Sequence, residues 1–281
     1  MIYLLLNIAS SALVSVFMRL SEGKAAGRVS MLAANYLTCS GLALAYSLAG
    51  GRPPAGGLAV TAGLGVVGGV LYLLAFVLLQ FNVGKNGVVL ASAFMKLGLL
   101  VPVTLSVALF GESPTMAQGA GFAVAVAAIL LMNWRSERNG DGRKSASAVW
   151  LVLLLLFAGG ANAMSKVFGQ WGAAGWSEWF LVFIFGSALV LALGVARRRG
   201  EKLGKRELLY GALIGVPNYF SSRFLLLALD SLPAVLVYPT SNMAALAAVT
   251  LVGVALFREQ LDRRQWLGMA MILAALALLN L

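Results

Sequence analysis

LFGESPTMAQGAGFAVAVAAILLMNW, residues Leu109–Trp134, returns 147 residues later as Leu256–Leu281, LFREQLDRRQWLGMAMILAALALLNL. Ten of the 26 aligned positions are identical. The identities include polar residues as well as apolar ones: Glu112 with Glu259, Gln118 with Gln265, Gly121 with Gly268, and Asn133 with Asn280. Two apolar helices that merely share a composition would not agree at such positions. The chain is therefore predicted to be a tandem duplication.

The same offset continues upstream, where it pairs Gly68 with Gly215 and Tyr72 with Tyr219. Between the two copies lies the longest polar insert of the chain. We therefore divide the sequence into a first repeat at residues 1–134, a linker at residues 135–147 and a second repeat at residues 148–281.

The amino-acid composition indicates what surrounds the two repeats. Hydrophobic residues make up 60% of the chain and charged residues 11%. Apolar runs near the roughly 20 residues that a helix needs to cross a bilayer fill both repeats. The net charge of +11 lies mostly in short loops between these runs, so it reports topology and not a nucleic-acid partner. We expect an all-α polytopic membrane protein whose surroundings are the lipid bilayer.

The sequence has few or none of the residue types that several kinds of chemistry require. There is one cysteine, Cys39, and no histidine. Disulfides, the usual zinc sites and histidine-based catalysis are therefore not expected, and we predict no metal and no cofactor. No phosphate-binding loop of the G-x-x-x-x-G-K type is present, so ATP is not expected to drive the protein directly.

Apolar runs predict ten transmembrane helices, five in each repeat. Their ranges are residues 1–20, 29–49, 58–81, 87–110, 116–133, 148–167, 176–196, 207–229, 233–257 and 265–281. A turn is expected at residues 82–86, a kink at Pro217 and a non-helical break at residues 238–242 around Pro239. Five spans per repeat is an odd number, so the second repeat enters the membrane inverted relative to the first. Transporters use inverted repeats to open a site at the membrane midplane alternately to each side.

The distribution of basic residues predicts the orientation. Loops after odd-numbered spans carry 17 of the 21 Lys and Arg residues. By the positive-inside rule these loops are cytoplasmic, which places both termini outside. We expect a multi-pass protein of a bacterial-type inner (plasma) membrane.

The ten-span duplication and its motifs resemble the drug/metabolite transporter superfamily, EamA type. The motifs are Phe-x-Glu followed by Gln and Gly near the end of each repeat, and Gly-x-x-x-Tyr in the third and eighth spans. The resemblance covers nearly the whole chain. It implies a central cavity lined by the third, fourth, eighth and ninth spans with parts of the first and sixth. It leaves the substrate open, because members of the superfamily move amino acids, vitamins, nucleotide sugars and lipid-linked sugars.

Two basic residues, Lys96 and Arg223, fall inside predicted spans and away from the span ends. A Lys or Arg at the bilayer centre costs on the order of 2.5 to 3.5 kcal/mol on insertion scales, so each needs a reason. Lys96, about ten residues into the fourth span, is our first candidate for substrate contact or proton coupling; a structural lysine paired with a helix carbonyl is the alternative. Arg223 lies near the outer end of the eighth span and shares a helical face with Tyr219. It either lines the cavity or reaches the outer interface or Asp230.

Neutral polar residues complete the predicted site. Within the expected break around Pro239, Tyr238, Ser241 and Asn242 would line a cavity, since non-helical backbone in a membrane is tolerated only inside protein or beside water. A tightly packed polar seam is the alternative. Asn162 in the sixth span and Tyr72, the repeat partner of Tyr219, are added to this set.

The acidic residues are assigned elsewhere. Glu178 is interpreted as a rim position at the start of the seventh span. Glu112 and Glu259 are interpreted as helix caps or loop pairs at the membrane interfaces, outside the site. With Lys96 and Arg223 as the intramembrane charges, the cavity is expected to be positive and to suit a carboxylate, a phosphate or a zwitterion.

The sequence therefore predicts a secondary transporter of a small anionic or zwitterionic metabolite, a small-molecule substrate moved by alternating access with a coupling proton as a further partner. Alternatives are a carrier or flippase for phosphate-bearing lipid headgroups, and a non-transporting scaffold or receptor. An intramembrane enzyme is disfavoured, because histidine is absent and no carboxylate lies deep in a span.

Overall fold

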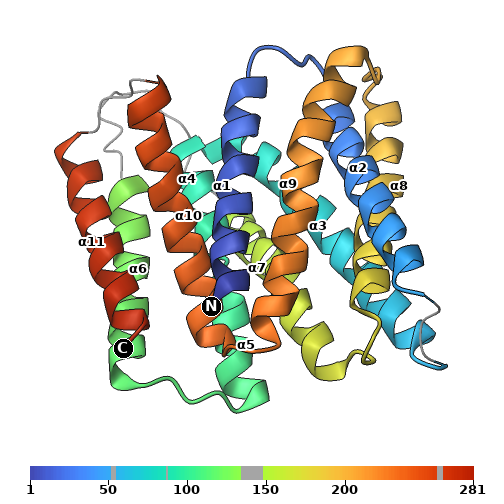
Figure 1. Cartoon of the computed structure of the whole chain (residues 1–281). Coiled ribbons are helices and arrows are strands. Elements are labelled where there is room, and N and C mark those ends of the chain that lie inside the picture. Colours follow the sequence, from blue (N-terminus) through green and yellow to red (C-terminus); the bar gives the residue numbers. More distant parts are fainter. Residues whose placement is uncertain (52–54, 87, 134–147, 258–261) are drawn as a thin grey trace. The chain divides into compact units, whose positions relative to one another are not determined.

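The computed structural model describes residues 1–51, 55–86, 88–133, 148–257 and 262–281. All secondary structure in these residues is helical, as predicted (Figure 1). The helices are α1 (Ile2–Ser21), α2 (Arg28–Ala49), α3 (Leu58–Asn86), α4 (Val88–Leu97), α5 (Leu100–Phe110), α6 (Met116–Asn133), α7 (Ala148–Trp171), α8 (Ser177–Arg198), α9 (Lys205–Leu229), α10 (Ala234–Phe257) and α11 (Arg263–Leu279).

Eight segments of the described chain are long and apolar enough to cross a membrane. They correspond to α1, α2, α3, the segment Ala91–Phe110 that joins most of α4 to α5, and α7, α8, α9 and α10. The apolar part of α6, Met116–Leu131, is shorter, and α11 has 17 residues. A multi-pass helical membrane protein is thus supported, while the count of ten spans stays a prediction.

The chain forms two compact units, and each takes residues from both predicted repeats. Unit 1 consists of Met1–Leu73 and Met164–Leu232, and unit 2 consists of Leu74–Ala163 and Pro233–Leu281. Helices α3 and α7 each contribute to both units. Sequence similarity therefore does not reveal which segments pack together. The predicted linker at residues 135–147 lies outside the described residues.

In unit 1, two helix crossings depend on glycine. α2 packs against α8 and α9, and α1 packs against α9 (Figure 1). α3 meets α8 at Gly65 and Gly69, and α9 meets α2 at Gly211 and Gly215. Both pairs have the Gly-x-x-x-Gly spacing that lets two helix backbones approach closely. A methyl group at any of the four positions would collide with the facing helix.

The two crossings use equivalent atoms. A Cβ on Gly65 would meet Phe183 Cβ, the Phe180 carbonyl oxygen and the Ile184 nitrogen. A Cβ on Gly211 would meet the corresponding atoms of α2: Ala34 Cβ, the Met31 carbonyl oxygen and the Asn35 nitrogen. In both sets the carbonyl oxygen lies three residues before the Cβ, and the nitrogen lies one residue after it.

The residue offset between the two sets of glycine contacts differs from the offset in the sequence alignment. Gly65 corresponds to Gly211 and Gly69 to Gly215, an offset of 146 residues (211 − 65 and 215 − 69). The alignment of the termini predicts 147 and pairs Gly68 with Gly215. Packing thus shifts the register of this helix pair by one residue.

Unit 2 is built on α6 and α11, which pack along each other, and on α10, which contacts α5, α6 and α11. The α6–α11 approach is close at Gly121, where an added Cβ would lie 3.0 Å from the Leu279 nitrogen. Apolar side chains fill the core of this unit: Leu99, Ala125, Ile129, Met243 and Ile272 are at most 1% exposed.

Two expected interruptions, the turn at residues 82–86 and the break around Pro239, are continuous helix. Residues 82–86, predicted as a turn, belong to α3, where the Asn82 amide donates to the Leu78 carbonyl at 2.8 Å and to the Trp150 carbonyl at 3.0 Å. α9 passes through Pro217, and α10 passes through Pro239 without the expected break. Pro239 is the sixth residue of α10, so the loss of its N–H affects one bond near the helix start.

The structure interrupts a different predicted span, which lies in the first repeat. The segment predicted as one helix at residues 87–110 is divided by a turn at Gly98–Leu99, between α4 and α5. Gly98 N–H donates to the Met95 carbonyl at 3.1 Å and Leu99 N–H to the Lys96 carbonyl at 3.2 Å, both tighter than the α-helical pattern. Gly98 also contacts the backbone of Gly159 in α7.

Carboxylates from other segments cap helix N-termini. In unit 1, Glu207 Oε1 accepts from Ala26 N–H at 2.9 Å, and Glu201 Oε2 accepts from Val29 and Ser30 N–H at 2.9 and 3.0 Å. These bonds satisfy the unpaired donors at the start of α2.

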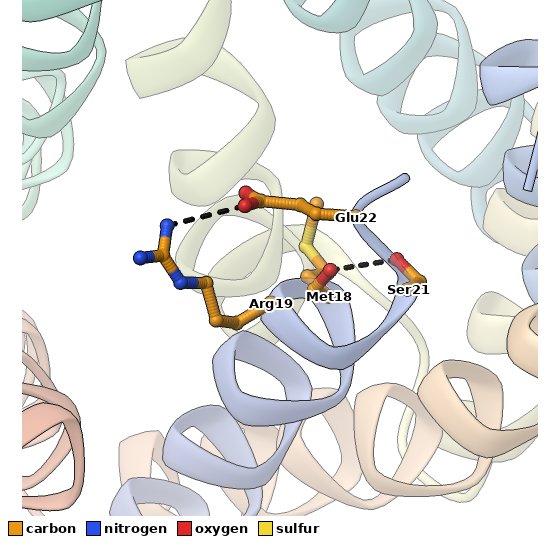
Figure 2. Close-up of polar contacts among 4 residues, drawn as sticks. All are labelled: Met18, Arg19, Ser21 and Glu22. Atoms are coloured by element: carbon orange, nitrogen blue, oxygen red, sulfur yellow. Dashed lines mark hydrogen bonds and ion pairs between the residues drawn. The ribbon is translucent and has the colours of Figure 1, made fainter. Parts of the chain in front are cut away.

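The C-terminal end of α1 is closed by local contacts (Figure 2). Ser21 Oγ donates to the Met18 carbonyl at 2.6 Å, and Arg19 pairs with Glu22 at 3.1 Å. The ion pair is exposed, so it adds little stability.

Candidate functional site

Lys96 lies in unit 2, in the last turn of α4 and directly before the turn that separates α4 from α5. A cation in this position is stabilised by the negative end of the α4 dipole. Its side chain is partly buried, and within the described residues Nζ has neither a hydrogen bond nor an ion pair. The lysine is therefore a charged group in an apolar segment whose partner is not supplied by the described chain.

Two polar residues of α10 that were predicted for the site, Tyr238 and Asn242, donate to backbone carbonyl groups of the same unit. Tyr238 is 2% exposed, and its hydroxyl donates to the carbonyl oxygen of Asn162 at 2.9 Å. Asn242 donates from Nδ2 to the Tyr238 carbonyl at 2.8 Å. Ser241 is buried. Because the helix continues through Pro239, these residues form a polar seam along α10, and their contact with substrate stays a prediction.

Glu112 closes the start of α10. Its two carboxylate oxygens accept from the N–H groups of Ala234 and Val235, both at 2.9 Å. The interpretation of Glu112 as a cap is confirmed, although the helix that it caps is distant in sequence. Glu259 lies outside the described residues.

Arg223 of unit 1 is held in a cluster of three helices. Its Nε donates to Glu178 Oε1 of α8 at 2.6 Å, and its guanidinium lies 4.3 Å from the ring centroid of Tyr46 of α2. The hydroxyl of Tyr219, one turn before Arg223 on α9, donates to Glu178 Oε2 at 2.8 Å. Both oxygens of Glu178 are thus engaged, one by a cation and one by a phenol.

The partner of Arg223 differs from the two that the sequence suggested. Arg223 pairs with Glu178, and the carboxyl of Asp230 has its pKa raised by partial burial. Glu178 is thereby part of a charged cluster, not only a rim position. The charge of Glu178 balances that of Arg223, so the cluster is close to neutral. Of the two cations expected inside the membrane, only Lys96 has no countercharge among the described residues.

Tyr72, the remaining predicted residue, lies on the unit 1 part of α3. Its hydroxyl is within electrostatic range of Tyr36 and of the buried Cys39 thiol. The structure therefore collects Tyr219 and Arg223 in one cluster of unit 1, and Tyr238, Asn162 and Asn242 in one seam of unit 2.

An apolar groove runs between α1 and α9 in unit 1. It has a volume of about 560 Å³. α1 contributes Ser10, Leu13 and Phe17, and α9 contributes residues from Leu209 to Phe224. Leu209 and Phe224 are 15 residues apart (224 − 209), which corresponds to about 22 Å at the α-helical rise.

Sequence reasoning missed two members of the Arg223 cluster. Tyr46 carried no signal, because a tyrosine near the end of an apolar helix is ordinary. Glu178 had one: it is an acidic residue in the first turn of a predicted span, and α9 must turn back along α8 so that Arg223 ends near it.

Three comparisons with known proteins show what this chain is similar to. A protein of Haemophilus influenzae, described as uncharacterized, is 22% identical over 283 residues, which cover 97% of this chain and 95% of that protein. A solved structure described as a crystal structure of a protein superposes with a TM-score of 0.76 at 16% identity, over 99% of this chain and 98% of the other, which shows the fold. The model of the EamA-like transporter family matches residues 145–281. The chain thus carries an EamA-like transporter family domain, consistent with membership of the drug/metabolite transporter superfamily.

Proposed function

We propose that this protein is a secondary transporter that moves a small anionic or zwitterionic metabolite by alternating access, with Lys96 as its principal substrate-binding residue. The observation that carries the proposal is the interruption of a membrane-spanning segment at Gly98–Leu99, immediately after Lys96. Transporters place substrate sites at such discontinuous helices, because an interrupted helix exposes backbone groups and charged ends inside the membrane.

The charge of Lys96 supports an anionic group on the substrate. A lysine in an apolar span is costly unless it has a partner, and within the described residues Nζ has none. A carboxylate or phosphate would satisfy the ammonium while bound. Asn162, Ser241, Asn242 and the Tyr238 hydroxyl of the same unit are proposed as neutral polar contributors beside Lys96. Within unit 1, Arg223 is proposed as a second, separate cation for the substrate, with the hydroxyl groups of Tyr72 and Tyr219 as its polar contributors.

Residues 1–134 and 148–281 are proposed as inverted repeats that exchange conformations during transport. The equivalent glycine contacts of α3 on α8 and of α9 on α2 support this, because two related halves should cross their neighbours in the same way. We further propose a bacterial-type inner membrane, with the basic loop Arg197–Arg206 in the cytoplasm and both termini outside.

The first test is thermal stabilisation of the detergent-purified protein by matched organic anions, zwitterions and cations. A ligand at 100 times its dissociation constant stabilises by about 2.7 kcal/mol, a readily measured shift. We expect an anion or zwitterion to stabilise the wild type and Lys96→Met to abolish the shift. Lys85→Met is the matched control, since it removes a lysine exposed at the end of α3. Stabilisation by cations alone, or an unaltered response of Lys96→Met, would contradict the proposal.

A second candidate function is a carrier for lipids with a phosphate-bearing headgroup. The groove between α1 and α9 favours it, because about 22 Å of apolar lining in a membrane suits an acyl chain. Vesicles that contain the protein and a fluorescent phospholipid separate the two functions. Transbilayer movement of the lipid that is slowed by Leu213→Trp in the groove would favour the lipid carrier, whereas flux of the soluble anion alone would favour the metabolite transporter.

A further inference from the structure

The contacts of Arg223 leave most of its guanidinium group available. Nε donates to Glu178 at 2.6 Å, and among the described residues neither Nη nitrogen has a hydrogen-bond partner. One face of the guanidinium is covered by the ring of Tyr46. Guanidinium groups recognise carboxylates, sulfonates and phosphates through paired N–H donors in one plane. Glu178 therefore fills only part of an anion-binding group.

Glu178 differs from Arg223 in the way its charge can be removed. Arginine keeps its charge at all physiological pH values, whereas one proton neutralises a glutamate. Among the described residues, the titratable or charged side chains in contact with Glu178 are Tyr219 and Arg223 from α9. Tyr46 from α2 contacts these two residues, and α7 packs on α8 through the uncharged Phe168. α3, which also packs on α8, presents the glycines Gly65 and Gly69 there. Arg223 is thus the cation whose pairing depends on the protonation of Glu178.

We propose that Glu178 and the substrate anion compete for Arg223, and that protonation of Glu178 exchanges one for the other. The proton binds a carboxylate oxygen of Glu178, the bond from Arg223 Nε to Glu178 breaks, and an anionic group of the substrate takes its place on the guanidinium. One proton and one negative charge enter together, so the net charge of the cluster is unchanged. The cluster thereby couples one proton to one anion moving in the same direction. This inference rests on the proposed function and adds its coupling ion.

The surroundings indicate what kind of anion fits. Tyr46, Tyr219 and Phe220 pack on one another, and Phe224 stacks on Phe220 and on Tyr3. The side chains of Arg223 and Glu178 are 29% and 25% exposed, so a ligand can reach them. An anion with an aromatic body matches these rings by stacking.

Benzenesulfonate is a suitable probe, because it keeps its charge in the pH range where glutamate titrates. Its affinity for the detergent-purified full chain would be measured by thermal shift at several pH values, with uncharged benzenesulfonamide as the matched control. Since one proton is taken up with each bound anion, the dissociation constant should fall by up to about tenfold for each unit that the pH is lowered. The sulfonamide should show no such dependence.

Three variants separate the exchange from simple anion binding. Glu178→Gln should bind benzenesulfonate with the same affinity at every pH, because its amide never competes as an anion. Its melting temperature in the absence of ligand should be lower than that of the wild type, and benzenesulfonate should raise it more than it raises the wild type. Arg223→Gln should lose the probe. Arg223→Lys, which keeps the charge but not the planar donors, should bind it more weakly than the wild type.

Failure of this inference is distinguishable from failure of the proposed function. Affinity that does not change with pH in the wild type, or a Glu178→Gln variant with the pH dependence of the wild type, overturns the exchange. If anions then still bind and Lys96→Met abolishes binding, the transporter proposal stands without this coupling. If no anion or zwitterion stabilises the wild type at any pH, both are overturned.

Discussion

Gly98 and Gly159 are in direct backbone contact: a Cβ atom on Gly98 would lie 2.9 Å from the nitrogen of Gly159. A Cβ on Gly159 would in turn collide with the Gly98 carbonyl oxygen and with Val101. Both residues belong to unit 2, and Gly98 forms the turn that follows Lys96. The position of the interrupted helix thus depends on two residues without side chains.

Gly159→Ala should therefore destabilise the protein by about 1 to 3 kcal/mol, the range for overpacking a close contact. Gly119→Ala in α6 is the control, because nothing lies within 4 Å of the added methyl group. There the substitution should stabilise by roughly 0.5 to 1 kcal/mol through helix propensity. Thermal or denaturant unfolding of both variants measures the difference. Equal effects at the two sites would mean that the contact is not tight in solution.

Glu112→Gln should weaken the start of α10 by about 0.5 to 2 kcal/mol, since two backbone N–H groups lose a charged acceptor. Glu22→Gln removes an exposed carboxylate paired with Arg19 and serves as control, with no measurable change expected. Hydrogen exchange of the Ala234 and Val235 amides should accelerate in Glu112→Gln only. Unchanged protection there would exclude the cap.

Tyr238→Phe should cost about 0.5 to 1.5 kcal/mol, because the bond from the buried hydroxyl to the Asn162 carbonyl is lost. The ring remains, so the packing of α10 against α7 should be kept. Tyr210→Phe, at a partly exposed position of α9, is the matched control and should leave the melting temperature unchanged. Similar melting temperatures for both variants would mean that the Tyr238 bond contributes no net stability.

Membrane orientation can be tested by cysteine labelling. The native Cys39 is fully buried, so it should give no background with a membrane-impermeant maleimide. Ala174→Cys, in the exposed connection between α7 and α8, should react in intact cells, whereas Lys202→Cys, between α8 and α9, should react only after the membrane is permeabilised. The opposite pattern would reverse the proposed topology.

The sequence predicted the elements that depend on local composition. The all-helical class follows from apolar runs of membrane length, and the range predicted for α6 agrees with Met116–Asn133. Capping by Glu112 was also accessible, because a carboxylate at an interface has few other roles. The motif near the end of the second repeat lies within residues 145–281, which the model of the EamA-like transporter family matches.

Features that depend on distant contacts were not accessible. The break beside Lys96 was expected instead at Pro239, because proline is a visible signal, whereas the close approach of Gly98 to Gly159 joins residues 61 positions apart (159 − 98). The one-residue change of repeat offset appears only when Gly69 and Gly215 are seen on their neighbouring helices.

The sequence by itself thus determined that the chain is a duplicated, helical membrane protein, since hydrophobicity and recurrence can be read along one dimension. Only the tertiary structure decided that each unit interleaves segments of both repeats and that Arg223 is neutralised by Glu178. The physical reason is that the energy of an intramembrane charge depends on its nearest partner, and that partner is chosen by helix packing and not by position in the chain.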